Sequence, residues 1–171
     1  RIEMEKIREL LKQLCFMPTV SGRELDSKNA LFALVGDAFD EKYEEIEEEI
    51  DPEMGSFEKL MYYNEELFGM IENRISIDLL ARLYSSQLIT KSEKHLLDNN
   101  RTYFKLLRKI ISHGQQNGVL RNDVSTNEIL KAYALFERAL LYDWCLCNGN
   151  YSLCNYSQTL LPMFLDGFRQ K

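Results

Sequence analysis

Residues 125–148, which read STNEILKAYALFERALLYDWCLCN, decide how the fold is interpreted. Ser125, followed three residues later by Glu128, forms a capping box, which predicts the start of a helix. Asn148 and the glycine after it predict the stop, because both residue types tolerate the left-handed turn that ends many helices. The apolar residues between these ends cover more than the roughly 100° stripe that an ordinary surface helix buries. The stretch therefore predicts a helix that packs on its own core and also on a second partner.

A second helix with a wide apolar face is predicted near the end of the chain, over residues 152–168. Its apolar residues recur at helical spacing and widen into more than one row. We interpret this pair of helices as the dimer-forming end of an all-helical protein. The predicted dimer contacts are Leu140, Leu141, Leu153, Leu160, Leu161, Phe164 and Phe168.

The rest of the chain also shows apolar residues at steps of three or four, and no long alternation with period two. The fold class is therefore predicted to be all-α, a bundle without an internal repeat. The predicted helices cover residues 2–14, 26–50, 56–75, 77–89 and about 103–114, with a polar loop at 90–100. Ser56 and Ser76 are predicted N-caps. Gly114 or Gly118, with Val119 and Leu120 after it, predicts a Schellman ending.

Composition and charge restrict the class of protein. The chain has 171 residues, of which 45% are hydrophobic, enough for one sizeable core with or without a small satellite domain. A net charge of -6 argues against the whole chain being a nucleic-acid clamp. The four cysteines show no regular spacing, which favours reduced thiols and a cytoplasmic protein. No run approaches the roughly 20 apolar residues of a membrane span, so no membrane partner is expected.

No motif for catalysis or metal binding is recognisable. A di-iron bundle needs Glu-x-x-His motifs, but His95 and His113 are preceded at that offset by Ser92 and Ile110. Neither histidine has a second ligand at zinc spacing. The cysteines could form a redox sensor, although inert core positions are favoured because no basic cluster lies near them in the sequence. We expect no metal, no cofactor and no enzymatic activity.

Two stretches resemble one protein family. Residues 110–144 contain a helix ending in Gly-x-x-x-Gly, a Val-Leu-Arg-x-Asp turn and a capped helix rich in leucine and aromatics. Residues 26–32, DSKNALF, contain Ser-Lys followed by a leucine. The first stretch is similar to the ligand domain of TetR (tetracycline repressor)-like transcriptional regulators. The second resembles the segment through which that family enters its long connecting helix. The resemblance covers residues 26–168.

The N-terminal region departs from the family pattern. Only residues 16–25 separate the first predicted helix from the connecting helix, which is too short for a complete helix-turn-helix. We therefore expect a partial DNA-binding region at residues 1–28, and a ligand-binding and dimerisation domain at 29–171. We also expect that part of the DNA-reading helix is missing between Met17 and Lys28. The candidate DNA contacts are Thr19, Ser21, Arg23 and Lys28.

The resemblance implies a homodimer that binds operator DNA and is released by a small molecule. Flexible and aromatic side chains suit an apolar ligand, with Glu137 or Arg138 as its polar contact. The candidate ligand contacts are Met61, Phe68, Tyr84, Tyr103, Phe104, Tyr133, Phe136, Glu137 and Trp144. For each of these residues a plain role in the core is the alternative. The alternative for the whole chain is a helical dimeric interaction or small-molecule-binding protein that does not bind DNA.

Overall fold

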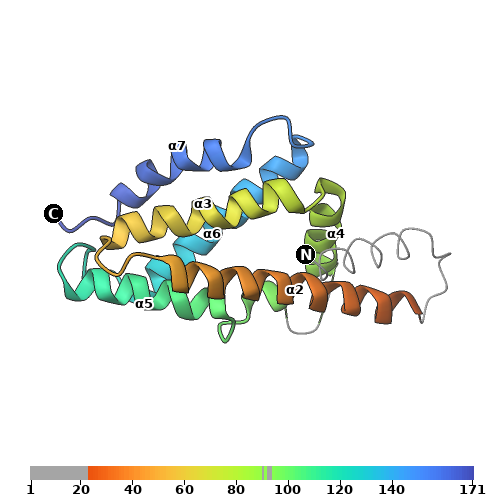
Figure 1. The fold of residues 1–171 in the computed structure, drawn as a ribbon, viewed down its shortest axis with the longest axis horizontal. Coiled ribbons are helices and arrows are strands. Elements are labelled where there is room, and N and C mark those ends of the chain that lie inside the picture. Colours follow the sequence, from red (N-terminus) through yellow and green to blue (C-terminus); the bar gives the residue numbers. More distant parts are fainter. Residues whose placement is uncertain (1–22, 90, 92–93) are drawn as a thin grey trace. The chain divides into compact units, whose positions relative to one another are not determined.

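The computed structural model describes residues 23–89, 91 and 94–171 (Figure 1). Its α-helices are α2 (Arg23–Glu49), α3 (Ser56–Arg74), α4 (Ile77–Ile89), α5 (Thr102–Gln116), α6 (Thr126–Leu146) and α7 (Leu153–Asp166), with a short 3₁₀-helix η1 (His95–Leu97). The described residues form no strand, only an isolated bridge between Leu120 and Arg169. The predicted all-α class is confirmed, while the helix predicted at residues 2–14 lies outside the described residues.

The chain divides into two compact units, residues 1–41 and 42–171. Helix α2 begins at Arg23, before the predicted start at Asp26, and runs without a break through Lys28. Its last two turns, from Lys42 onward, belong to the second unit together with α3 to α7. The helix thus passes through the predicted domain boundary at residues 28 and 29.

One predicted cap is wrong. Gly55, not Ser56, is the N-cap of α3, and no side chain caps this helix. Ser56 is buried, and its hydroxyl points to the place where α5 passes at Gly114: a β-carbon added to Gly114 would lie 2.8 Å from Ser56 Oγ. The serine is therefore used for close helix packing. Ser76 behaves as predicted, because its Oγ accepts a hydrogen bond of 3.3 Å from the backbone N–H of Leu79.

The core of the second unit lies between α3, α5, α6 and α7. Helix α3 packs along α7 and also against α5, while α6 packs against α4, α5 and α7. In Figure 1, α3 and α7 lie side by side and run in opposite directions. The largest fully buried apolar side chains come from all of these layers and include Leu60, Phe68, Ile71, Leu107, Ile111, Ile129, Leu130 and Leu153.

The turn after α5 is the predicted Schellman ending. Gly118 has a positive φ of 68°, a conformation that costs glycine little. The N–H of Val119 donates to the carbonyl of Gly114 at 2.9 Å, and that of Gly118 donates to Gln115 at 3.2 Å. Leu120 follows and is fully buried. These bonds satisfy carbonyls that the end of the helix leaves free, and they direct the chain toward α6.

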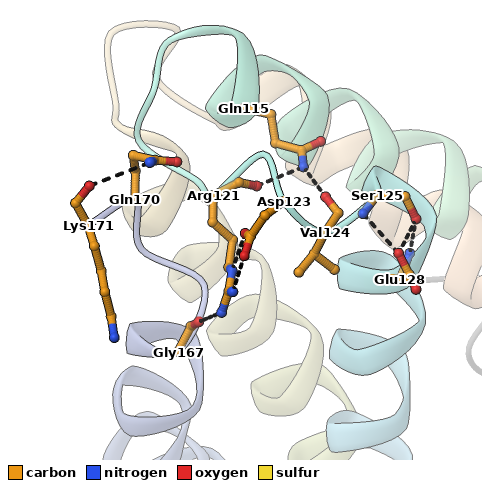
Figure 2. Close-up of polar contacts among 9 residues, drawn as sticks. All are labelled: Gln115, Arg121, Asp123, Val124, Ser125, Glu128, Gly167, Gln170 and Lys171. Carbon is orange, nitrogen blue, oxygen red and sulfur yellow. Dashed lines mark hydrogen bonds and ion pairs between the residues drawn. The ribbon is translucent and has the colours of Figure 1, made fainter.

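Arg121 joins this turn to the C-terminal segment (Figure 2). Its guanidinium forms an ion pair with Asp123 and donates to the carbonyl of Gly167 at 3.2 Å. Its backbone N–H donates to the carbonyl of Phe168 at 2.9 Å. From α5, Gln115 Nε2 donates to the carbonyls of Arg121 and Val124. The Val-Leu-Arg-x-Asp stretch is therefore hydrogen-bonded both to the end of α5 and to the C-terminal segment.

Both ends of α6 are as predicted. Ser125 Oγ accepts from the N–H of Glu128 at 3.3 Å, and the Glu128 carboxylate accepts from the N–H of Ser125 at 2.9 Å, which completes the capping box. At the other end, Asn148 and Gly149 have φ values of 51° and 69°. The Gly149 N–H donates to the carbonyl of Trp144 at 3.0 Å. None of the described helices is long and apolar enough to cross a membrane.

Candidate functional site

A carboxyl group lies buried in the middle of α6. Glu137 follows Tyr133 by four residues and precedes Leu140 by three, so it faces the core with them. Its side chain is 3% exposed. Asn64 Nδ2, from α3, donates to Glu137 Oε1 at 2.8 Å, and the hydroxyl of Tyr103, from α5, donates to Oε2 at 2.6 Å. The carboxyl therefore joins three helices at one point.

The hydrogen bonds continue from Asn64 into α7. Ser157 Oγ donates to Asn64 Oδ1 at 2.5 Å, and Gln158 Nε2 donates to the same oxygen at 3.4 Å. Asn64 and Ser157 are both fully buried. Since Oδ1 accepts from α7, the amide nitrogen of Asn64 must face Glu137. We refer to Glu137, Asn64, Tyr103 and Ser157 as the core polar network; it links α3, α5, α6 and α7.

Three tyrosine rings lie against this network. Tyr43, Tyr63 and Tyr103 have ring centroids 5.6 to 5.8 Å apart, a spacing at which aromatic rings attract one another. We call these three residues the tyrosine triangle. Tyr43 belongs to the last turns of α2, and Tyr103 also hydrogen-bonds Glu137. The triangle therefore places the connecting helix one side chain away from the buried carboxyl.

Two fully buried tyrosines of the core differ in their hydrogen bonding. The hydroxyl of Tyr133 donates to the carbonyl of Leu60 at 2.8 Å. The hydroxyl of Tyr63 is buried and has no hydrogen-bond partner within the described part of the chain. A buried hydroxyl without a partner is uncommon, because its desolvation is not compensated. Tyr63 is thus the unsatisfied member of this polar region.

Burial controls the electrostatics of the site. Desolvation raises the pKa of Glu137 from 4.5 to about 7, against the hydrogen bonds from Tyr103 and Asn64 and the charge of Arg138, which lower it. Burial also raises the pKa values of Tyr63, Tyr103 and Tyr133 well above 10, and the charge of Glu137 adds to each. The ion pairs among the described residues do not include Glu137. Its charge is therefore stabilised only by hydrogen bonds and by Arg138 at longer range.

The structure brings part of the predicted ligand set together. Glu137, Tyr103 and Tyr133 meet in the core, and Phe104 packs edge-on against Tyr103 with centroids 4.8 Å apart. Phe68 is fully buried on α3, while Met61 and Tyr84 are half-buried. Burial raises the pKa of Tyr84, which lies near enough to Arg138 for that charge to oppose the shift.

Two other predicted ligand residues lie in different surroundings. Phe136 stacks on Phe164 of α7, with centroids 4.7 Å apart, so it helps to hold α6 against α7. Trp144 is buried, and its Nε1 donates to the carbonyl of Tyr151 at 2.9 Å in the turn that leads to α7. Among the described residues, neither side chain is hydrogen-bonded to the core polar network.

The sequence interpretation missed Asn64, Ser157, Tyr43 and Tyr63 as parts of the site. A signal was present: Asn64 occupies a position in the apolar stripe of α3, four residues after Leu60 and three before Leu67. Ser157 likewise stands between Leu153 and Leu161 on α7. A polar residue at a core position needs a hydrogen-bond partner, so both positions predicted a buried polar contact.

The predicted dimer contacts fall into two groups in this chain. Leu140, Leu141, Leu153 and Leu161 are buried in the core of this chain. Leu160, Phe164 and Phe168 are half-buried. The large exposed apolar side chains on these two helices are instead Leu135, Tyr142 and Leu146 of α6, and Tyr156 and Met163 of α7. We refer to these five residues as the α6–α7 face.

The predicted DNA contacts fall at the start of the described chain. Thr19 and Ser21 lie outside the described residues, and Arg23 and Lys28 belong to the first turns of α2. The proposed missing segment between Met17 and Lys28 also lies mostly outside the described residues. From Arg23 onward the helix is continuous.

Within residues 23–89, 91 and 94–171, no group of three or more histidine, cysteine, aspartate or glutamate side chains is arranged to hold a metal ion. Cys145, Cys147 and Cys154 are free thiols, and burial raises the pKa of Cys145 and of Cys154. Comparison with family models, with curated proteins and with solved structures finds no match.

Proposed function

We propose that the chain is the ligand-responsive and dimerising part of a TetR-like transcriptional regulator. In this proposal the core around Glu137 receives a small molecule, two copies associate through the α6–α7 face, and α2 transmits the ligand signal toward the N-terminal DNA-binding region. The protein then acts in the cytoplasm as a repressor that a ligand releases from operator DNA.

The observation that carries the proposal is the position of Tyr43. This residue of α2 packs on Tyr63 and Tyr103, with ring centroids 5.8 and 5.6 Å away. Tyr103 donates its hydroxyl hydrogen to Glu137 at 2.6 Å. A ligand that takes over a hydrogen bond of Glu137 therefore disturbs Tyr103 and, through one ring contact, the connecting helix. Coupling of this kind needs a continuous chain of packed side chains and two alternative packings.

The α6–α7 face supports the dimer. Leu135, Tyr142 and Leu146 are 60%, 52% and 63% exposed, and their spacing of seven and four residues aligns them along one side of α6. Met163 of α7 is 73% exposed. Large exposed apolar side chains on α6 and on α7, two helices that pack together, favour an interaction surface. A second copy is the simplest partner because a two-fold interface uses the same patch on both chains.

A selection experiment tests the DNA part of the proposal. The protein with its complete DNA-reading helix, including the segment expected between Met17 and Lys28, is incubated with a library of random duplexes, and bound DNA is sequenced over several rounds. We expect enrichment of a palindromic site whose half-sites lie roughly one helical turn apart, because a dimer presents two equivalent reading heads. The control is the variant carrying Arg23→Ala and Lys28→Ala, which should lose the enrichment.

The same experiment distinguishes the proposed regulator from the main alternative function. The α6–α7 face fits equally well a helical dimer that binds a small molecule or another protein without DNA. A dimer that enriches no sequence supports that alternative and contradicts the regulator.

A further inference from the structure

Among the residues that the structure describes, no cationic side chain forms an ion pair with the buried carboxylate of Glu137. Its hydrogen bonds from Asn64 and Tyr103 use one acceptor position on each oxygen, and an ionised carboxylate has about four. The cationic side chain that acts on it is Arg138, which forms no ion pair with it. A buried charge in this state is costly unless a counter-charge or further hydrogen bonds are supplied. The site therefore favours a positively charged hydrogen-bond donor.

The Tyr63 hydroxyl is a second, independent feature of the same region. Its ring is fully buried, and its oxygen has no hydrogen-bond partner among the described residues. The ring lies 5.8 Å from that of Tyr103, whose hydroxyl donates to Glu137 at 2.6 Å. An unpaired phenol oxygen can accept a hydrogen bond from a donor that also faces the carboxylate. The rings of the tyrosine triangle add a negative electrostatic face that attracts cations.

We propose that Glu137, Tyr63 and Tyr103 form a recognition site for a protonated amine carried by an otherwise apolar ligand. An ammonium group has three N–H donors on one nitrogen, so one group can serve both Glu137 and Tyr63. Phe104, which packs on Tyr103, supplies apolar surface beside the charge. This inference rests on the proposed function, since it names the chemical class of the ligand for the same core.

The network also explains how such a ligand would be sensed. In the structure, Asn64 donates to Glu137 and accepts in turn from Ser157 of α7. An ammonium bound at Glu137 competes with the Asn64 amide for the carboxylate and loosens the link between α3 and α6. The site is closed, because Tyr63, Asn64, Tyr103 and Glu137 are all buried. Binding therefore requires the helices to move, which is the two-state behaviour that a ligand sensor needs.

Four probes and three variants test the site by thermal shift and by isothermal titration. Phenethylamine, which is protonated at neutral pH, is compared with neutral 2-phenylethanol, anionic phenylacetate and the non-aromatic cation butylamine, each up to about 10 mM. Glu137→Gln keeps the shape and removes the charge, and Tyr63→Phe removes only the hydroxyl. Glu65→Gln, on the exposed side of α3, is the matched control. Circular dichroism establishes that each variant is folded.

We expect saturable binding of phenethylamine to the wild type and to Glu65→Gln, and weaker binding of butylamine, 2-phenylethanol and phenylacetate. Glu137→Gln should bind phenethylamine at least about tenfold more weakly, and Tyr63→Phe several-fold more weakly. A folded Glu137→Gln variant that binds phenethylamine as tightly as the wild type overturns the inference. Absence of phenethylamine binding overturns it too, and leaves an internal water as the partner of Tyr63.

The failure of this inference differs from failure of the proposed function. If 2-phenylethanol binds and phenethylamine does not, the ligand class is wrong while a ligand-responsive dimer remains supported. If the chain is a monomer that enriches no DNA sequence, the proposed function fails whatever the amine does.

Discussion

Each face of α6 carries side chains that are unusual for their surroundings, although the buried face is otherwise apolar. The buried face carries the carboxyl of Glu137, while the exposed face carries Leu135, Tyr142 and Leu146. An ordinary surface helix buries its apolar residues and exposes its charges. The buried carboxyl and the exposed apolar side chains each have a free-energy cost for the isolated chain. We therefore propose a partner for each: a ligand that hydrogen-bonds the carboxyl, and a second helix surface that covers the apolar side chains. Both proposed interactions therefore involve residues of α6.

Charge placed on the exposed face should have the largest effect. The double variant Leu135→Glu and Leu146→Glu introduces like charges into the proposed dimer contact and removes two apolar anchors. We expect the dimer dissociation constant to rise about 1,000-fold, or about 4 kcal/mol, as measured by sedimentation equilibrium. The fold should persist in circular dichroism, because both side chains are more than half exposed.

Lys105→Glu, an exposed charge change on α5, is the control and should leave association unchanged. A double variant that remains as dimeric as the wild type would show that the exposed face is not the contact.

Removing the buried charge should change how stability depends on pH. The pKa of Glu137 in the folded chain, about 7, lies above its ordinary value of 4.5, so the folded state holds the proton more tightly. The contribution of this group to stability is therefore fully present below pH 4.5 and is lost as the pH rises through 7. The loss amounts to about 3 kcal/mol at pH 8. Glu137→Gln should abolish this pH-dependent loss of stability.

Urea unfolding at pH 5 and at pH 8 measures the effect. The difference in unfolding free energy between Glu137→Gln and wild type should become more favourable to the variant at the higher pH. The control Glu65→Gln should follow the wild type at both values. If the stability of Glu137→Gln depended on pH as that of the wild type does, the raised pKa of Glu137 would be contradicted.

The paired and unpaired tyrosines of the buried side can be compared directly. Tyr133→Phe removes a hydrogen bond to Leu60 and should lower the unfolding free energy by about 1.5 kcal/mol. Tyr63→Phe removes a hydroxyl that has no partner and should leave stability unchanged or slightly higher. Chemical denaturation of the two variants in parallel gives the difference. Equal decreases in unfolding free energy for the two variants would mean that the Tyr63 hydroxyl is hydrogen-bonded in solution.

The smallest effect is expected at the start of α6. Ser125→Ala removes the side-chain acceptor of the capping box and should destabilise the chain by about 1 kcal/mol in urea unfolding. Ser85→Ala, the same substitution at an exposed position on α4, is the control and should leave the unfolding free energy almost unchanged. A loss below the error of the measurement would show that the box contributes little to stability.

Local signals predicted the ends of the helices well. The capping box at Ser125, the Schellman turn at Gly118 and the stop at Asn148 were all readable, because each depends on a few neighbouring residues. Ser56 was misjudged, since its hydroxyl serves close packing near Gly114 rather than the cap. That difference arises from a contact between distant segments, which local pattern does not contain.

Contacts between helices explain the other misses as well. Helical spacing indicated wide apolar surfaces on α6 and α7, but it could not tell which rows face the chain's own core. Leu153 and Leu161 are fully buried, whereas Leu135 and Met163 are exposed. Glu137 was singled out as a polar contact, yet its partner Asn64 lies 73 residues away along the sequence. The partner of a buried polar group follows only from how the helices pack.

The mass of the wild-type chain in solution tests the central claim most directly. Light scattering coupled to size-exclusion chromatography, at several protein concentrations near 10 µM and above, distinguishes one chain from two. If α6 turns Leu135, Tyr142 and Leu146 toward a second copy, the mass corresponds to two chains throughout. The mass of a single chain at every concentration would contradict the account.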